Sequence, residues 1–300
     1  MTDLVLALDV GGTKIAGALV DRGGAVRRAV RVATPAGSAE EVWDAVASVV
    51  EQVAQGEGVA GVGIASAGPV DVDAGTVSPI NVAGWRGFPL RERVSALLPG
   101  VPVELAGDGP CMALGEHWLG AGQGSRFVLG LVVSTGVGGG LVLGGRPFGG
   151  RTGNAGHVGH VVVEPDGEAC PCGGRGCAET VAGGPRMVAW ARRLGWQGPD
   201  GADAAHLAAA AGTGEEIPKA AFERAGRAVG LAIAATAAVV DLDLAVVGGG
   251  VAQAGDLLFD PIRRTVADHC GLSYLSSLRV EPARLGGQAG LVGAARLVLG

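Results

Sequence analysis

Lysine is nearly absent from this sequence of 300 residues. Lys14 and Lys219 are the only two, and arginine supplies the other positive side chains. The formal net charge is -6 and the sequence pI is ≈ 5.4. An acidic chain of this kind lacks the basic surface that nucleic acids require, so we expect no nucleic-acid partner.

Long hydrophobic runs are also absent, although hydrophobic residues make up 48% of the chain. The longest run, residues 228–240, is shorter than the ~20 apolar residues of a transmembrane helix and ends at Asp241. It predicts a buried, alanine-rich helix instead. The first residues lack the basic and apolar segments of an export signal. We therefore expect a cytoplasmic protein without a membrane partner.

Cysteine is rare, but three of the five cysteines fall in one short glycine-rich segment. Cys170, Cys172 and Cys177 have the spacing C-x-C-x4-C, and His160 precedes them. Three thiolates and one imidazole would complete a tetrahedral zinc site with no open position, which is typical of structural zinc. The alternative is a disulfide with one spare thiol.

Glycine is abundant, and its placement repeats along the chain. The first copy has apolar strands predicted at 4–9, 15–20 and 25–32, with Gly11, Gly12 and Thr13 in the turn between the first two. The second has a strand at 128–134, a turn at 135–140, a strand at 141–143 and a further turn at 144–145. Two such copies predict a duplicated α/β architecture.

Glycine turns of this kind can bind phosphate through backbone N–H groups. Neither turn is a Walker loop, because the G-K-[ST] ending and the following helix are missing. Asp9, before the first turn, can hold Mg²⁺ through water, and the Thr13 hydroxyl can donate to a phosphate oxygen. The alternative is two ordinary hairpin turns.

A third glycine cluster follows the apolar strand predicted at 244–247. Ligands bind at the carboxyl ends of strands in open α/β sheets, and glycine there lets a base or ribose lie close to the backbone. The alternative for Gly248, Gly249 and Gly250 is a tight strand-to-helix turn.

Local patterns predict several other elements. Ser38 and Glu41 form a capping box before an amphipathic helix whose valines recur at helical spacing. Residues 195–214 predict a loop and a short helix, and residues 288–299 a final helix.

Five motifs together resemble the ROK family of bacterial sugar kinases and repressors, over nearly the full length. The motifs are L-A-L-D-V-G-G-T-K at 6–14, G-I-A-S-A-G-P-V-D at 63–71 leading to Asn81 and Trp85, S-T-G-V-G-G-G at 134–140, G-H at 159–160 with the three cysteines, and V-V-G-G-G-V at 246–251. The resemblance implies the actin-like, duplicated two-lobe α/β ATPase fold of hexokinase and Hsp70. It implies a small lobe of residues 1–108 with the C-terminal helix 288–300, and a large lobe of residues 109–287. Some family members are repressors with an N-terminal helix-turn-helix, but only eight residues precede Asp9, so we expect no such domain.

The resemblance also implies roles for individual residues. Asp108, which precedes M-A-L-G-E at 112–116, would be the general base, and the alternative for Asp108 alone is a helix N-cap. ATP and its phosphates would be bound by Asp9, Gly11, Gly12, Thr13, Lys14, Thr135, Gly136, Gly138, Gly248, Gly249 and Gly250. The sugar would be bound by Gly68, Asn81, Asp108, His157, His160 and Glu179, and zinc by His160, Cys170, Cys172 and Cys177.

Two positions depart from the family pattern. Gly107 replaces an asparagine that contacts a sugar hydroxyl, and His157 replaces a glutamate that holds hydroxyls near C1 and C2. An imidazole can donate a hydrogen bond where a carboxylate only accepts. We therefore expect an altered sugar choice, tilted toward a 2-acetamido sugar. The alternative is a degenerate pocket without kinase activity.

The sequence thus predicts an ATP-dependent kinase that uses Mg-ATP and a structural zinc. Its expected substrate is an aldohexose or N-acetylhexosamine, with glucose or N-acetylglucosamine leading, phosphorylated at the 6-hydroxyl. The alternatives are a non-catalytic sugar-binding protein and a kinase with another phosphoryl donor, such as polyphosphate. The resemblance also implies a homodimer or homotetramer.

Overall fold

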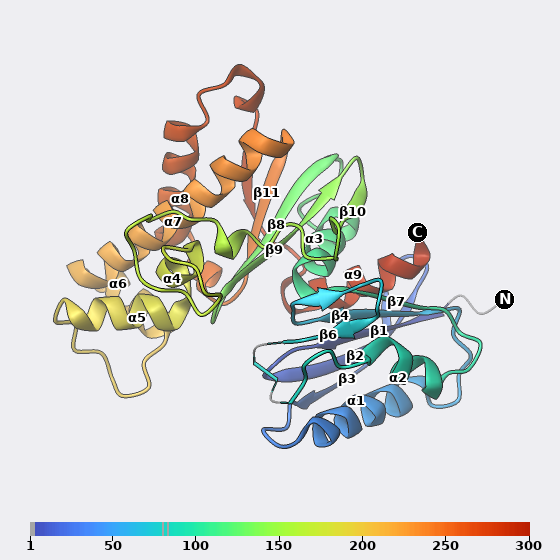
Figure 1. The fold of residues 1–300 in the computed structure, drawn as a ribbon. Helices are drawn as coiled ribbons and strands as arrows, with labels where there is room; N and C mark the ends of the chain where they lie inside the picture. Colours follow the sequence, from blue (N-terminus) through green and yellow to red (C-terminus); the bar gives the residue numbers. More distant parts are fainter. Residues whose placement is uncertain (1–3, 80, 83) are drawn as a thin grey trace. The chain divides into compact units, whose positions relative to one another are not determined.

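The computed structural model describes residues 4–79, 81, 82 and 84–300 (Figure 1). Residue contacts divide the chain into two compact units. Unit 1 comprises Met1–Gly124, Gly140–Gly156 and Gly287–Gly300, and unit 2 comprises Ser125–Gly139 and His157–Gly286.

Both units contain strands and helices. Those in unit 1 are β1 (Leu4–Val10), β2 (Lys14–Asp21), β3 (Val26–Ala33), α1 (Ala39–Ala54), β4 (Val62–Ser66), β5 (Val70–Asp71), β6 (Thr76–Val77), α2 (Leu90–Leu97), β7 (Val103–Gly107), α3 (Asp108–Leu119), β10 (Arg146–Phe148) and α9 (Ala289–Leu299). Those of unit 2 are β8 (Phe127–Val133), the start of β9 (Val137–Leu143), η1 (Val158–His160), α4 (Ala178–Ala182), α5 (Gly184–Arg193), α6 (Ala204–Gly212), α7 (Glu216–Val240), β11 (Leu244–Gly248), η2 (Val251–Ala254), α8 (Asp256–His269), η3 (Ser273–Leu275) and β12 (Arg279–Pro282). A last 3-10 turn, η4 (Gly286–Gln288), lies where the second unit ends and the first resumes.

The predicted duplication is confirmed by the strand order. One sheet has the order β3-β2-β1-β4-β7 and the other β10-β9-β8-β11-β12. In each, an antiparallel hairpin pair leads to strands that run parallel, with β1 beside β4 and β8 beside β11. The chain therefore builds the same five-strand pattern twice, as the actin-like fold requires.

The first sheet has helices on both faces, because its buried strands alternate their side chains. Leu6 and Leu8 belong to the cluster that includes the α1 valines, and α1 begins with the predicted capping box. Val5 and Ala7 point the other way and join the cluster of α9. Small residues let α9 lie close on that face, since a Cβ at Gly63 would come 1.8 Å from the Ala294 carbonyl oxygen.

Two segments group differently from the predicted lobes. α3 belongs to unit 1, because it packs on α9: a Cβ at Gly115 or Gly293 would overlap the backbone of the other helix. Residues 140–156 also group with unit 1. There a Cβ at Gly140 would come 2.3 Å from Pro110 of α3, and the Asn154 amide bonds both backbone polar groups of Val70.

The helices of unit 2 confirm several sequence predictions. The alanine-rich segment 228–240 is the C-terminal part of α7, which ends at Asp241. α7 packs closely on α8, because Gly226 and Gly230 leave room for Pro261 and Thr265. The short helix predicted within 195–214 is α6. Among the described residues, no helix has the length and hydropathy needed to cross a bilayer.

One turn is shorter than predicted. The second glycine turn was expected at 135–140, but β9 already begins at Val137. Gly138, Gly139 and Gly140 are therefore strand residues. At Gly140 the missing side chain serves the close approach to Pro110 described above.

Candidate functional site

The first glycine turn, Gly11–Thr13, joins β1 to β2 and is fixed by its backbone. The Gly11 N–H donates to the Lys14 carbonyl at 2.9 Å, and the Thr34 hydroxyl donates to the Gly11 carbonyl at 2.7 Å. A Cβ at Gly12 would lie 2.4 Å from the Asn81 side chain. The fold thus brings together Gly12 and Asn81, which the sequence assigns to phosphate and sugar. Thr13 is exposed, so its hydroxyl can reach a ligand.

Asp9 ends the apolar part of β1 and has a side chain only 13% exposed. Burial raises the pKa of its carboxyl, while the Lys14 ammonium, with Nζ 3.5 Å from Oδ2, lowers it. Gly290 at the start of α9 faces this carboxylate, since a Cβ there would lie 3.3 Å from Oδ2. Asp9 and Lys14 are therefore paired to each other beside the turn.

Asp108 is the first residue of α3, one position after the N-cap, which is Gly107. The N-cap alternative for Asp108 is therefore wrong, although its carboxylate accepts a hydrogen bond from the Gly109 N–H at 2.8 Å. The side chain stays exposed, yet surrounding protein atoms remove much of its hydration. This loss of hydration, with the charge of Asp9, raises the pKa of Asp108 to about 6.

The second glycine turn, Ser134–Gly136, joins β8 to β9. The Ser134 N–H donates to the Gly136 carbonyl at 2.8 Å, and the Ser134 carbonyl accepts from the Gly184 N–H at 2.7 Å. Glu179 accepts a hydrogen bond from the Val137 N–H at 3.0 Å. Thr135 and Gly136 lie in this turn as predicted, whereas Gly138 lies in β9.

A cavity of about 570 Å³ opens beside the second turn, within unit 2. This volume suits a small-molecule ligand. Its walls come from the turn, from α5, from the segment leading into α6 and from the third glycine cluster. The lining residues are Ser134, Thr135, Gly184, Pro185, Val188, Ala189, Arg192, Ala202, Asp203, Ala204, Ala205, Gly250 and Val251.

The sequence predicted only some of the residues that line this cavity. Thr135 and Gly250 were predicted to bind nucleotide, but the α5 residues Val188 and Arg192 and the α6 N-cap Asp203 were missed. They belong to no glycine motif. The only local signal is Gly183-Gly184-Pro185, which marks the start of α5.

The third glycine cluster is both a strand-to-helix turn and a cavity wall. Gly248 ends β11, and Gly250 is the N-cap of η2. Gly249 has φ +96°, and a Cβ there would come 2.3 Å from the Val133 carbonyl oxygen. Glycine at 249 is therefore required by backbone conformation and by the close approach to β8.

The predicted sugar-binding residues fall into both units. Gly68 follows β4, and both Gly68 and Asn81 belong to unit 1. In unit 2, His157 caps η1, and its ring centroid lies 5.7 Å from that of His160. Burial lowers the pKa of His157, and the nearby His160 lowers it further, while Glu179 raises it. The neutral form of the His157 imidazole is therefore favoured. This form can donate one hydrogen bond and accept another.

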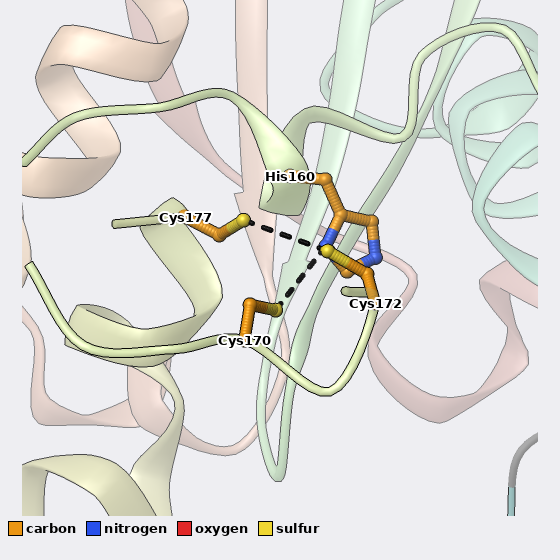
Figure 2. A group of neighbouring side chains, drawn as sticks. All are labelled: His160, Cys170, Cys172 and Cys177. Carbon is orange, nitrogen blue, oxygen red and sulfur yellow. Dashed lines mark hydrogen bonds between the residues drawn. The ribbon is translucent and has the colours of Figure 1, made fainter. Parts of the chain in front are cut away.

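The four predicted metal ligands converge in unit 2 (Figure 2). Their ligand atoms all lie within 4.8 Å of one another, and the Cys172 and Cys177 sulfurs are 3.8 Å apart. Four ligands around a tetrahedral ion with Zn–S of ≈ 2.3 Å give a sulfur–sulfur distance of about 3.8 Å. All five cysteines are free thiols, so the disulfide alternative is wrong. The residues present fit a structural zinc ion.

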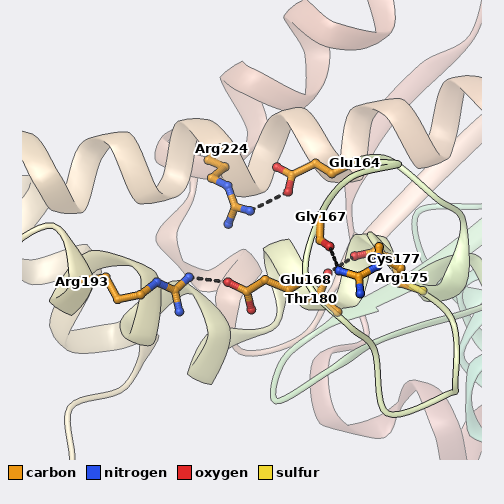
Figure 3. Close-up of polar contacts among 8 residues, drawn as sticks. All are labelled: Glu164, Gly167, Glu168, Arg175, Cys177, Thr180, Arg193 and Arg224. Carbon is orange, nitrogen blue, oxygen red and sulfur yellow. Dashed lines mark hydrogen bonds and ion pairs between the residues drawn. The ribbon is translucent and has the colours of Figure 1, made fainter.

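The loop that carries these ligands is tied to two helices by ion pairs (Figure 3). Glu164 pairs with Arg224 of α7 at 2.8 Å, and Glu168 pairs with Arg193 of α5. Within the loop, Arg175 donates to the Gly167 carbonyl at 2.8 Å. The Glu168–Arg193 pair is exposed and contributes little stability, whereas the Glu164–Arg224 pair is partly buried.

The chain is similar to known proteins of one family over nearly its whole length. The model of the ROK family matches residues 5–300. The chain is 36% identical to the glucokinase of Streptomyces coelicolor, covering 98% of this chain and 97% of that protein. It is 33% identical to an N-acetylmannosamine kinase of Yersinia pseudotuberculosis, covering 97% and 96%. Among solved structures, a ROK family glucokinase from Streptomyces griseus in complex with glucose and AMPPNP has a TM-score of 0.83 and 37% identity, covering 98% of each chain.

Proposed function

Because the chain belongs to the ROK family, we propose that it is an ATP-dependent sugar kinase. The proposed reaction transfers the γ-phosphoryl group of ATP to the 6-hydroxyl of an aldohexose or N-acetylhexosamine. Glucose and N-acetylglucosamine are the leading substrates. Relatives named glucokinase and N-acetylmannosamine kinase, similar over nearly the whole chain, support both sugar classes.

The environment of Asp108 carries this proposal. Its pKa of about 6 leaves it mostly ionised at neutral pH, yet close enough to accept a proton efficiently. We assign it as the general base that takes the proton of the sugar hydroxyl. Positioning and neutralisation of phosphate charge would supply most of the remaining rate enhancement.

The glycine turns would bind the phosphates through their backbone N–H groups. In unit 1, Gly11, Gly12, Thr13 and Lys14 would contact them, and Asp9 would hold Mg²⁺ through water. When bound, Mg²⁺ neutralises charge on the phosphoryl oxygens. In unit 2, Thr135 and Gly136 would contact the phosphates and the cavity would take the adenosine, with Gly248–Gly250 against it. Gly138 stays a predicted phosphate residue, now placed on a strand.

We propose that the sugar is bound by Gly68 and Asn81 of unit 1 and by His157, His160 and Glu179 of unit 2. Zinc, held by His160, Cys170, Cys172 and Cys177, would keep this loop in shape when bound. The cytoplasmic location and the homodimer or homotetramer stay predictions.

A sugar panel assayed for ADP release with Mg-ATP tests the proposal. We expect turnover with at least one aldohexose or N-acetylhexosamine, and a product phosphorylated at the 6-hydroxyl by NMR. Polyphosphate in place of ATP tests the alternative donor. Sugar binding by calorimetry without turnover from any donor would support the non-catalytic alternative, which the departures at Gly107 and His157 motivate.

A further inference from the structure

We propose that Glu179 positions the second glycine turn for nucleotide binding, and that the zinc ligands hold Glu179 there. This inference rests on the proposed function, since it assigns the turn to nucleotide phosphates. It gives Glu179 a role besides the sugar contact, and it connects the metal loop to the nucleotide.

Glu179 contacts the second glycine turn directly. Glu179 Oε2 accepts the Val137 N–H at 3.0 Å, at the residue where the turn becomes β9. A Cβ at Gly136 would lie 2.3 Å from the same oxygen, so the carboxylate occupies the space beside Gly136. Glycine at 136 therefore permits the turn and the carboxylate to pack directly together.

Two consecutive helices hold this turn at its two ends. Glu179 lies in the first turn of α4 and accepts the Val137 N–H. Gly184 is the first residue of α5, and its N–H donates to the Ser134 carbonyl at 2.7 Å. The turn is thus fixed before Thr135 by α5 and after Gly136 by α4.

Two of the predicted zinc ligands lie at the ends of elements that contact Val137. Cys177 is the N-cap of α4, and its carbonyl accepts the Thr180 hydroxyl at 2.7 Å. His160 ends η1, whose Gly159 packs so closely on Val137 that a Cβ would come 1.8 Å from its carbonyl oxygen. An ion bound by His160 and Cys177 would therefore clamp η1 and α4 against the start of β9.

The consequence reaches the nucleotide cavity, because Ser134, Thr135 and Gly184 line it. Loss of the Glu179 bond would let the turn move relative to the cavity wall. A carboxylate has two oxygens, so bonding Val137 through Oε2 is compatible with a sugar contact through Oε1.

Binding of ADP with Mg²⁺, measured by calorimetry without sugar on the zinc-loaded protein, tests this role. Glu179→Ala should weaken ADP binding about tenfold, because it removes a hydrogen bond to a charged acceptor. Glu179→Gln keeps the length and an acceptor oxygen, so we expect ADP affinity within about threefold of wild type. Glu179→Asp keeps the charge but is one methylene too short, and should bind ADP less well than Glu179→Gln.

Glu164→Ala is the matched control, because it removes a carboxylate of the same loop that pairs with Arg224 instead of the turn. It should leave ADP affinity unchanged. Hydrogen exchange of the segment around Val137 should rise in Glu179→Ala and stay as in wild type in the control. Zinc content is measured for every variant, so that metal loss is not mistaken for loss of the bond.

Removal of zinc by a chelator supplies the second arm. It should weaken ADP binding by wild type and have little further effect on Glu179→Ala, since both changes release the same turn. The proposal is overturned if Glu179→Ala binds ADP like wild type, or if Glu179→Asp outperforms Glu179→Gln. Failure of wild type to bind ADP would refute the proposed function as well, whereas normal ADP binding by all variants would refute this inference alone.

Discussion

The two glycine turns share a strand pattern but differ in what surrounds them. The first has charged residues of its own, with Asp9 and Lys14 paired at 3.5 Å and the charge of Asp9 acting on Asp108. The second lies between the apolar residues Val133 and Val137, and its carboxylate partner, Glu179, comes from α4. The two turns thus share a backbone pattern, while the charged groups beside them come from different parts of the chain.

This difference indicates how each turn can be damaged. Changing a charged side chain beside the first turn should lower kcat. Removing the residues of α4 and η1 that contact the second turn should weaken nucleotide binding. Five experiments test or sharpen this contrast.

The largest effect is expected for Asp108→Asn. Without a carboxylate to accept the hydroxyl proton, kcat should fall by ~10²–10⁴-fold, while ATP affinity stays near wild type. Steady-state kinetics and nucleotide calorimetry measure the two quantities. A variant that keeps more than a third of the wild-type kcat would show that the proton goes elsewhere.

The second experiment removes one predicted metal ligand from the loop that precedes α4. Cys172→Ser replaces a thiolate ligand, so bound zinc should fall from about one ion per chain to nearly none. Thermal stability and sugar affinity should fall with it. Metal analysis and melting curves provide the readout, with Cys270→Ser as the control outside the ligand set. Full activity in a zinc-free protein would contradict a structural metal.

The third experiment uses pH to identify the base beside the first turn. The pKa of Asp108 is raised to about 6, so its carboxyl protonates as the pH falls through that value. The value of kcat/KM for the sugar should therefore drop about tenfold per pH unit below about 6. Asp108→Asn should lack this acidic limb. A wild-type profile that stays flat down to pH 5 is the opposing result.

The fourth experiment introduces the same methyl group into each turn. Gly136→Ala should push against Glu179 and raise the KM for Mg-ATP severalfold, consistent with one weakened hydrogen bond. Gly12→Ala should also displace the exposed Asn81 side chain, so we expect the KM for the sugar to rise together with the KM for Mg-ATP. A KM for the sugar that Gly12→Ala leaves unchanged would contradict the sugar contact proposed for Asn81.

The smallest effect concerns the choice of sugar. His157→Glu restores an acceptor-only carboxylate, so it should shift kcat/KM toward glucose over the acetamido sugars by several-fold to tenfold. The ratio is measured with glucose, N-acetylglucosamine and N-acetylmannosamine. A wild type that prefers glucose more than tenfold, with a ratio unchanged by the substitution, would remove His157 from the determinants of specificity.

The sequence predicted what depends on neighbouring residues. Hairpins were recognisable because glycine turns interrupt apolar strands, and the α1 capping box because Ser38 and Glu41 stand three apart. The four candidate zinc ligands could be predicted to converge because three of them, Cys170, Cys172 and Cys177, lie within eight residues. The duplicated architecture was predicted because the pattern occurs twice in the sequence, whereas the order of the strands within each sheet was not predicted.

What the sequence did not reveal depends on residues far apart in the chain. Glu179 and Val137 are 42 positions apart, and the Glu179 signal indicated only a sugar contact. The cavity wall comes from the sides of α5 and α6, whose residues Val188 and Asp203 form no motif. The grouping of residues 140–156 with unit 1 depends on Gly140 packing against Pro110, which no local pattern predicts.

The position of α9 has a consequence for biosynthesis. A ribosome releases β1–β7 long before residues 289–299, and all of unit 2 is made in between. The sheet face formed by Val5, Ala7 and Ala18 therefore stays uncovered by α9 until the segment Ser125–Gly286, about 160 residues, has been translated. Nascent apolar surface attracts chaperones and other unfinished chains in proportion to its area. The small side chains that let α9 pack closely also limit the apolar area that this sheet face exposes before α9 is made.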